Sequence, residues 1–359
     1  MKQRRGMFAL GVAVALASSV ALFAQNKDDK KRDDAQKKEI QSLVKIVDDA
    51  AAGQPAANDL SITWLREDVL KAQGNKEYVP FTVAVDPSKV TGDKVAFYWR
   101  VVAKGAAPEP APAAAAAGKK DDKKKDDKDK NKKTDYAYED ITFVPVTPGQ
   151  NPMRISRSFT VPAGAYDVFL VAKEPTPEKP PKNAPPPKLS LLKQTVTVPD
   201  FWNGDLATSS VIVAQRIDPL PTPLTPQQQA DRPYALGQME IVPTFDTKFS
   251  KKSELSTFML IYNPKVDAAN KPDVTVEYNF YQKQTGQPEK FFNKTNPQNL
   301  NAQTLPPQFD LAAGHQLQSG QAVPLASFPE GDYRLEIKVT DKIANKTLTR
   351  EINFTVTPS

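Results

Sequence analysis

The single histidine of the chain is the first place to look for acid–base chemistry. His315 stands in the stretch LAAGHQLQSG, and the 359 residues contain no cysteine. A Ser-His-Asp triad would have to use His315, yet no Gly-x-Ser-x-Gly turn occurs anywhere in the sequence. A zinc site needs three or four ligands, so a Cys/His zinc site is excluded. We therefore expect an ordinary loop histidine and a protein without a cofactor.

Carboxylates are the remaining groups that could bind a metal or transfer a proton. The run DKDKNK at 127–132 begins like an EF-hand loop, but Lys132 replaces the required glycine and Tyr138 the bidentate glutamate. Asp267 and Asp273 could join a calcium site between strands, although solvated turn residues are the simpler interpretation. A carboxylate pair for glycoside hydrolysis has no spacing signature in a sequence, so a carboxylate-based hydrolase is kept only as a third hypothesis.

The stretch PDFWNGDL at 199–206 is the best candidate for a ligand or partner contact. Phe201 and Trp202 precede a turn made by Asn-Gly-Asp. An exposed tryptophan on such a loop could stack on a sugar ring or anchor a protein partner. The alternative, which we favour, is that both aromatic side chains fold back and fill a junction between two domains. Trp64 and Trp99 fall within strand patterns and are expected in the core.

The N-terminus MKQRRGMFALGVAVALASSVALFAQN has the pattern of a secretory signal peptide. Three positive residues precede an apolar run from Met7 to Ala24, which is short and weakly apolar for a membrane-spanning helix. We predict cleavage after Ala24, with Ala21 as a second choice, and a signal peptide over 1–24. The protein is then exported, to the periplasm or the outside, and meets a membrane only through this segment.

The net charge of +6 does not indicate a nucleic-acid partner. The leader contributes three positive charges, and the run at 119–133 has nine Lys and five Asp. Subtracting these leaves a net charge of −1 for the rest of the chain, so no basic face is predicted.

The elements that must position the candidate residues are mostly strands. A helix is expected within the charged segment 25–54, because Ile40, Leu43, Val44 and Val47 fall on one helical face. Period-two stretches rich in β-branched and aromatic residues then recur to the C-terminus. We predict an all-β protein of two tandem antiparallel Ig-like β-sandwich domains, at 55–217 and 234–359. The first would carry a disordered insertion at 104–134 and a Pro-rich loop at 174–188, and 218–233 would be a Pro-rich linker.

Two stretches support a duplicated domain. VPAGAYDVFLVA at 161–172 and FPEGDYRLEIKV at 328–339 share Pro-x-Gly-x-Tyr followed by a strand. VPFTVAVDP at 79–87 similarly matches STFMLIYNP at 256–264. The glycine permits positive φ in a tight turn, and the tyrosine hydroxyl can reach a backbone group, as in the tyrosine corner of Ig-like sandwiches.

The C-terminal stretch GDYRLEIKVTDKIANKTLTREINFTV resembles the closing hairpin of Ig-like or fibronectin-III-like modules in exported bacterial proteins. VTVPDFWNGDLATSSVIVAQRI is similar to segments that follow the sandwich modules of GWxTD-associated exported proteins of acidobacterial type, although the Gly-Trp-x-Thr-Asp signature is absent. This resemblance implies a β-sandwich fold and export, and no reaction.

These observations favour a non-catalytic, exported binding or scaffold protein for another envelope or extracellular protein. The alternative is a carbohydrate-binding protein that uses loop aromatics such as Trp202. We expect a protein partner or a glycan, and no nucleic acid.

Overall fold

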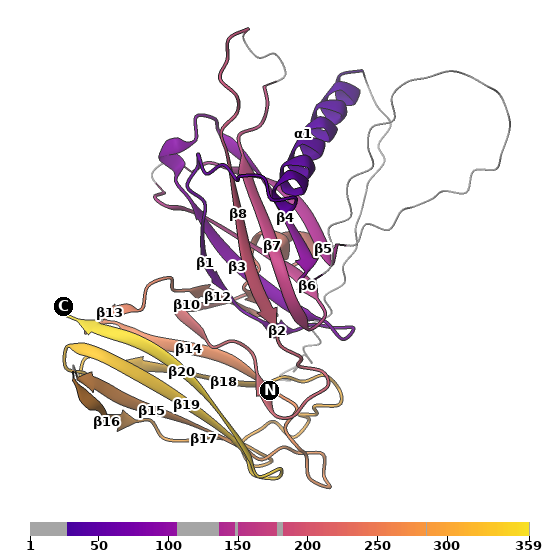
Figure 1. Cartoon of the computed structure of the whole chain (residues 1–359). Coiled ribbons are helices and arrows are strands. Elements are labelled where there is room, and N and C mark those ends of the chain that lie inside the picture. Colours follow the sequence, from indigo (N-terminus) through magenta and orange to yellow (C-terminus); the bar gives the residue numbers. More distant parts are fainter. Residues whose placement is uncertain (1–26, 106–135, 148–149, 178–181, 285, 359) are drawn as a thin grey trace, which may run out of the picture.

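The computed structural model describes residues 27–105, 136–147, 150–177, 182–284 and 286–358, with side chains described from Gln36 onward (Figure 1). The predicted signal peptide with Ala24 lies outside the described residues. So do nearly all of the predicted insertion at 104–134 and positions 178–181 of the Pro-rich loop. The described chain is an all-β structure of two Ig-like sandwiches with a helix packed against the first.

The first sandwich consists of sheets A and B. Sheet A has the order β5-β4-β7-β8, and sheet B pairs β3 with β1 and β2 on one side and with β6 on the other. The strands are β1 (Thr63–Glu67), β2 (Leu70–Lys71), β3 (Glu77–Val85), β4 (Lys94–Ala103), β5 (Tyr138–Pro145), β6 (Met153–Val161), β7 (Gly164–Lys173) and β8 (Leu189–Val198), with a 3-10 turn η1 (Pro87–Lys89) between β3 and β4.

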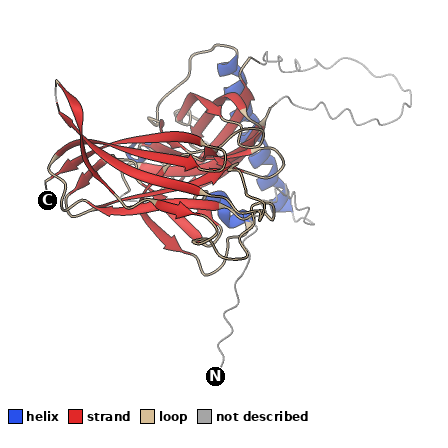
Figure 2. Ribbon diagram, turned by 90° about the horizontal axis from the view of Figure 1, so that it is seen from below, coloured by secondary structure: helices blue, strands red, loops and turns tan. Residues whose placement is uncertain are grey.

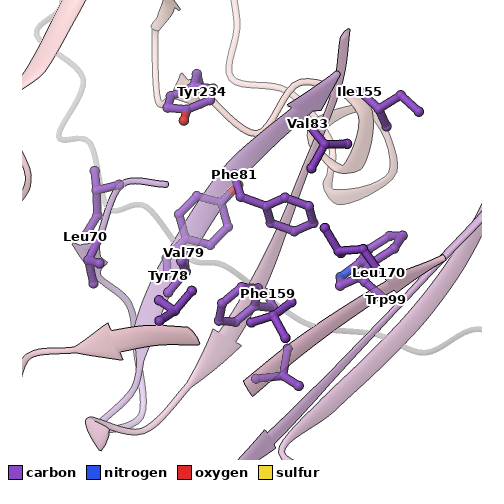
Figure 3. Packing of buried hydrophobic residues seen from close by; sticks show 14 of the residues in the cluster. Leu70, Tyr78, Val79, Phe81, Val83, Trp99, Ile155, Phe159, Leu170 and Tyr234 are labelled. Carbon is purple, nitrogen blue, oxygen red and sulfur yellow. The ribbon is translucent and has the colours of Figure 1, made fainter. Parts of the chain in front are cut away.

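Alternation along the strands builds the core of this sandwich. Phe81 of β3, Trp99 of β4 and Phe159 of β6 are all nearly fully buried between the sheets (Figure 3). Phe81 packs its ring edge-on to Trp99 at 6.1 Å between ring centroids, and Trp64 stacks on Phe81 at 5.0 Å. The expectation that Trp64 and Trp99 belong to the core is confirmed for Trp99, and Trp64 is half-buried at its margin.

The opposite face of sheet A is covered by helix α1 (Lys27–Ala51), which packs in cis (Figure 2). Leu43 and Val47 of the predicted apolar stripe are fully buried against Tyr98 and Phe169 of the sheet. A buried ion pair between Glu39 of the helix and Lys173 of β7 fixes the position of the helix along the sheet. Among the described residues, no helix combines the length and apolar character needed to cross a bilayer.

The second sandwich consists of sheets C and D. Sheet C has the order β11-β12-β10-β14-β18 with β9 added to β14, and sheet D has the order β13-β20-β19-β15-β16 with β17 added to β15. The elements are β9 (Ala207–Thr208), β10 (Ile212–Pro219), α2 (Pro226–Asp231), β11 (Ala235–Leu236), β12 (Met239–Pro243), β13 (Lys248–Ser250), β14 (Glu254–Tyr262), β15 (Val274–Gln284), β16 (Gln287–Lys294), β17 (Gln298–Leu300), β18 (Leu317–Pro324), β19 (Gly331–Asp341) and β20 (Lys346–Thr357).

The two sandwiches share one pairing pattern, as the sequence repeat suggested. In the first, β3 pairs with β6 and the other sheet runs β5-β4-β7-β8; in the second, β14 pairs with β18 and the other sheet runs β16-β15-β19-β20. The repeated Pro-x-Gly-x-Tyr stretches occupy equivalent turns, before β7 and before β19. Gly164 has φ +155° and Gly331 has φ +139°, which explains the glycine in both copies.

The predicted domain boundary at 218–233 does not agree with the strand pairing. β10, which the sequence placed in the first domain, pairs with β12 and β14 of sheet C. The Pro-rich segment that follows contains helix α2, whose N-terminus has a complete capping box between Thr225 and Gln228. The chain therefore passes from one sandwich to the other between β8 and β9, because β10 needs both neighbours to complete its hydrogen bonds.

The two sandwiches are joined through a buried contact. Successive residues of β14 alternate between them: Met259 and Ile261 face the core of the second sandwich, whereas Phe258 and Leu260 join the buried cluster of the first. Tyr234, which precedes β11, is also part of that first cluster (Figure 3).

Polar groups at this junction are paired. Asp68 is 2% exposed and accepts hydrogen bonds from the Arg66 guanidinium, at 2.7 and 2.8 Å, and from the Tyr234 hydroxyl, at 2.8 Å. The Tyr78 hydroxyl donates to the Pro233 carbonyl at 2.9 Å. A buried carboxylate is stable only when it is paired in this way, so the network fixes how the sandwiches meet.

Candidate functional site

The structure separates the two aromatic residues predicted as ligand or partner contacts. Phe201 is 3% exposed and packs against Tyr262 of β14, with 4.9 Å between ring centroids. It fills the junction between the sandwiches, as one of our two interpretations held, and is therefore not available to a ligand. Trp202 is 37% exposed. Its indole N–H donates to the Lys76 carbonyl at 3.0 Å, so the ring has a fixed position beside the β2–β3 hairpin.

Charged groups surround Trp202. The ammonium of Lys71 lies 4.2 Å from the centroid of the Trp202 ring, a cation–π contact that covers one face of the indole. Lys71 stands directly opposite Glu77 in the β2–β3 pairing. Glu77 is 1% exposed; its Oε1 accepts the Phe201 N–H at 2.9 Å, while its Oε2 has no hydrogen-bond partner among the described residues. Burial raises the pKa of the Glu77 carboxyl and lowers the pKa of the Lys71 amine.

Three loops are tied to one another at the end of β14 beside Phe201 and Trp202. They are residues 199–206, 263–273 and 341–346, and we call them together the loop surface. Asn263 donates its side-chain amide to the Phe201 and Asp205 carbonyls at 3.1 and 3.3 Å, which ties the first loop to the second. Lys346 forms an ion pair with Asp205, which ties the first to the third.

A buried carboxylate holds the second and third loops together. Asp341 is fully buried at the end of β19; its Oδ2 accepts the Lys265 N–H at 2.7 Å, and its Oδ1 accepts the Ile343 and Ala344 N–H groups, each at 3.0 Å. A carboxylate that accepts three backbone N–H groups orders the segments that supply them. The three loops therefore form a single ordered surface.

Exposed apolar side chains are concentrated on this surface. The large apolar residues exposed among the described part of the chain are Trp202, Ile217, Val266, Phe291 and Ile343. Three of the five belong to the loop surface, one on each loop. Apolar side chains gathered on an ordered surface commonly mark a contact site for another protein.

The other candidate residues have structural environments. His315 accepts the Asp310 N–H at its Nδ1, at 3.0 Å, and packs beside Phe309, as expected of a loop histidine. Asp267 accepts the N–H groups of Ala269 and Lys271 within its own turn, each at 2.9 Å. Within the described ranges, no cluster of three or more His, Cys, Asp or Glu side chains could hold a metal ion.

The sequence analysis identified Trp202 but not the two other exposed apolar residues of the loop surface. Val266 and Ile343 lie in polar turns, NPKVDAANKPD and DKIANK, where a single apolar residue is an available signal: apolar side chains are unusual at the tip of a solvated turn. Asp341 could not be singled out, because its role depends on contact with Lys265, 76 residues earlier in the sequence.

Comparisons with known proteins identify no family. No protein-family model matches the sequence, and no curated protein matches it. Similar solved structures are the trypsin-activated alpha-2-macroglobulin of Escherichia coli, an alpha-2-macroglobulin mutant of Salmonella and the native E. coli protein. The identities are 10%, 11% and 10%, with TM-scores of 0.22, 0.19 and 0.20.

The matches cover 85%, 84% and 85% of this chain but only 17%, 17% and 16% of those chains. The chain thus spans about a sixth of their length, and such TM-scores do not indicate a shared overall arrangement. The resemblance to GWxTD-associated modules stays a prediction.

Proposed function

We propose that this chain is an exported, non-catalytic binding or scaffold protein that contacts a protein partner through the loop surface. The observation that carries the proposal is the placement of Trp202, Val266 and Ile343 on three loops tied together by Asn263 and Asp341. An ordered apolar surface binds with a small entropy cost, because its side chains need not be fixed on association.

A protein partner is favoured over a glycan by the state of the Trp202 ring. A sugar stacks on an open aromatic face, whereas the Lys71 ammonium already covers one face of this indole. The neighbouring apolar residues of the surface are aliphatic, and Phe201, the other aromatic residue of the first loop, is buried. The charged rim carries both signs, and Lys342 and Lys346 are paired with Asp273 and Asp205. Such a rim suits a partner with a mixed polar edge around an apolar centre.

The proposal is tested by placing a photo-crosslinking amino acid at position 266 or 343 and irradiating the protein in envelope extracts. Position 353 is the matched control, because Asn353 is exposed on β20 seven residues beyond Lys346, where it pairs with Arg334 of β19. We expect one shared protein adduct from positions 266 and 343 and none from 353. Adducts of the same composition from all three positions would overturn the proposal. Glycan-array binding that is lost in Trp202→Ala would instead support a carbohydrate-binding function.

A further inference from the structure

A hollow lies between the two sandwiches, at the opposite end of β14 from the loop surface. Its volume is about 820 Å³. Glu254 and Ser256, at the start of β14, line it, whereas Tyr262 at the end of the same strand contacts Phe201 beside the loop surface. Eight residue steps along a strand correspond to about 27 Å, so the hollow and the loop surface are separate sites.

The hollow is a cleft between domains with walls from both sandwiches. Arg154 and Ser156 of β6 form one wall, and residues 240–249 and 253–256 contribute to the other. Clefts at domain interfaces are common ligand sites, and this volume is in the upper part of their usual range of roughly 300–1,000 Å³.

Two carboxylates of the cleft are already neutralised. Asp231 pairs with Arg157 at 2.9 Å, and Glu240 accepts hydrogen bonds from Arg232, which lowers the pKa of that carboxyl. A carboxyl whose pKa is lowered beside a guanidinium is a poor proton donor at neutral pH, so Glu240 does not favour a hydrolase.

Arg154 differs from Arg157 and Arg232, which pair with the cleft carboxylates. Its guanidinium lies 4.8 Å from the centroid of the Phe245 ring, across the cleft, and forms no ion pair among the described residues. Lys248, on the same wall as Phe245, likewise has no side-chain ion pair there. A guanidinium that is stacked on a ring keeps its planar edge free for bidentate contact with a carboxylate.

The remaining chemistry of the cleft fits a peptide better than other ligands. Asp246 and Glu254 bring negative charges to the same cleft, so a polyanion such as nucleic acid is not matched. The rings of Tyr234 and Phe249 are buried, and Arg154 occupies one face of the Phe245 ring, so the cleft offers a sugar little aromatic surface for stacking. An extended peptide of mixed charge matches these signs.

We propose that this cleft is a second binding site, which takes an extended peptide segment through an acidic side chain bound by Arg154 and Lys248. The site does not depend on the loop surface, and the two proposals can fail separately. The stacking of Arg154 on Phe245 orients the guanidinium before the ligand arrives.

Selection of a random dodecapeptide display library on the purified chain tests this proposal. Enriched peptides are then titrated by fluorescence polarisation against the wild type, Arg154→Glu, Arg154→Lys and a Val266→Asp/Ile343→Asp variant. Arg154 is exposed and its only described contact is the Phe245 ring, so its substitutions should fold; circular dichroism checks this.

We expect enriched peptides with a shared Asp or Glu. Arg154→Glu, or neutralising that peptide residue, should weaken binding about tenfold or more, because a charge-assisted hydrogen bond is lost. Arg154→Lys should give an intermediate loss, and the loop-surface variant should bind as the wild type does. Peptides without an acidic preference, unchanged affinity in Arg154→Glu, or no enrichment at all would overturn the proposal.

Discussion

Tyr166 and Tyr333, 167 residues apart, make the same hydrogen bond. Each hydroxyl donates to the carbonyl of the proline four residues earlier, Pro162 and Pro329, and both distances are 2.8 Å. The prediction of a tyrosine corner in each repeat is thus confirmed. The bond closes the turn before β7 in one sandwich and before β19 in the other, so the same hydrogen bond stabilises the equivalent turn in each sandwich.

Removing either hydroxyl should cost similar stability. Tyr166→Phe and Tyr333→Phe should each lower the free energy of unfolding by about 1 kcal/mol, because one partly buried hydrogen bond is lost while the ring stays packed. Urea denaturation measures this. Tyr281→Phe is the control, since its hydroxyl lies 3.5 Å from the Glu336 carboxylate on the solvent face, and it should change stability by less than about 0.5 kcal/mol. If Tyr333→Phe left the free energy of unfolding unchanged while Tyr166→Phe lowered it, the two repeats would not be equivalent.

The buried ion pair under α1 predicts a local effect. The Lys173 ammonium lies 2.6 Å from the Glu39 carboxylate, and both side chains are less than 10% exposed. Lys173→Met leaves an unpaired buried charge, and it should weaken helix docking by about 3 kcal/mol. Hydrogen exchange of the amides of α1 is the measurement.

A double variant separates the charge effect from the loss of packing. Glu39→Leu combined with Lys173→Met removes both charges and should restore most of the protection of α1. Lys45→Ala breaks an exposed pair with Asp49 and should cost no more than about 0.5 kcal/mol. If Lys173→Met leaves exchange as in the wild type, α1 does not depend on this pair.

Glu77 predicts a pH dependence of stability. Its folded pKa is raised by burial, so the neutral carboxyl stabilises the fold at pH values below the unfolded pKa of about 4.3, and that contribution is lost as pH rises through the folded pKa. Glu77→Gln keeps an acceptor for the Phe201 N–H but cannot ionise. Relative to the wild type, it should therefore gain stability as the pH rises from the unfolded pKa through the raised folded pKa.

Urea unfolding at several pH values checks the sign of this dependence. The control is Glu330→Gln, because Glu330 is fully on the surface and its substitution should leave the pH profile unchanged. A wild type that gains stability over Glu77→Gln as pH rises would mean that the Lys71 charge outweighs burial at this site.

The continuous junction predicts cooperative unfolding. Phe258, Leu260 and Tyr262 of β14 belong to the buried cluster of the first sandwich, and Tyr234 is bonded to Asp68 of that sandwich. We expect one calorimetric transition for both sandwiches, since unfolding either would expose the other's apolar surface. Tyr234→Phe should lower the midpoint while keeping a single transition. Two well-separated transitions in the wild type would contradict this interpretation.

Strands with regular alternation were predictable because each places one face in a core. β19 is the clearest example: Tyr333, Leu335, Ile337 and Val339 are buried, and the residues between them are not. β18 was missed, because its sequence LQSGQAVP contains glycine and few β-branched residues. Gly320 is needed there, since a Cβ would lie 2.5 Å from the Thr257 carbonyl oxygen. That close approach exists only in the folded sheet.

The position of the domain change could not be obtained from composition. Prolines at 218–233 look like a linker, yet the apolar run of β14, LSTFMLIY, already indicated a strand buried on both faces. The sequence also contained a signal for α2, because Thr225 and Gln228 have the spacing of a capping box.

The sequence could not decide whether Phe201 or Trp202 would be exposed, because the exposure depends on how Tyr262 and Lys71 approach the loop from two different sandwiches.

Quantitative capture from envelope extracts tests the central claim most directly. The wild type is compared with Val266→Asp/Ile343→Asp, which places charges on the loop surface, and with Asn353→Asp as a control further along β20. We expect the double variant to recover at least about tenfold less of the proteins captured by the wild type, and the control to recover the same amount. Equal recovery by all three proteins would show that the loop surface is not where this chain meets its partner.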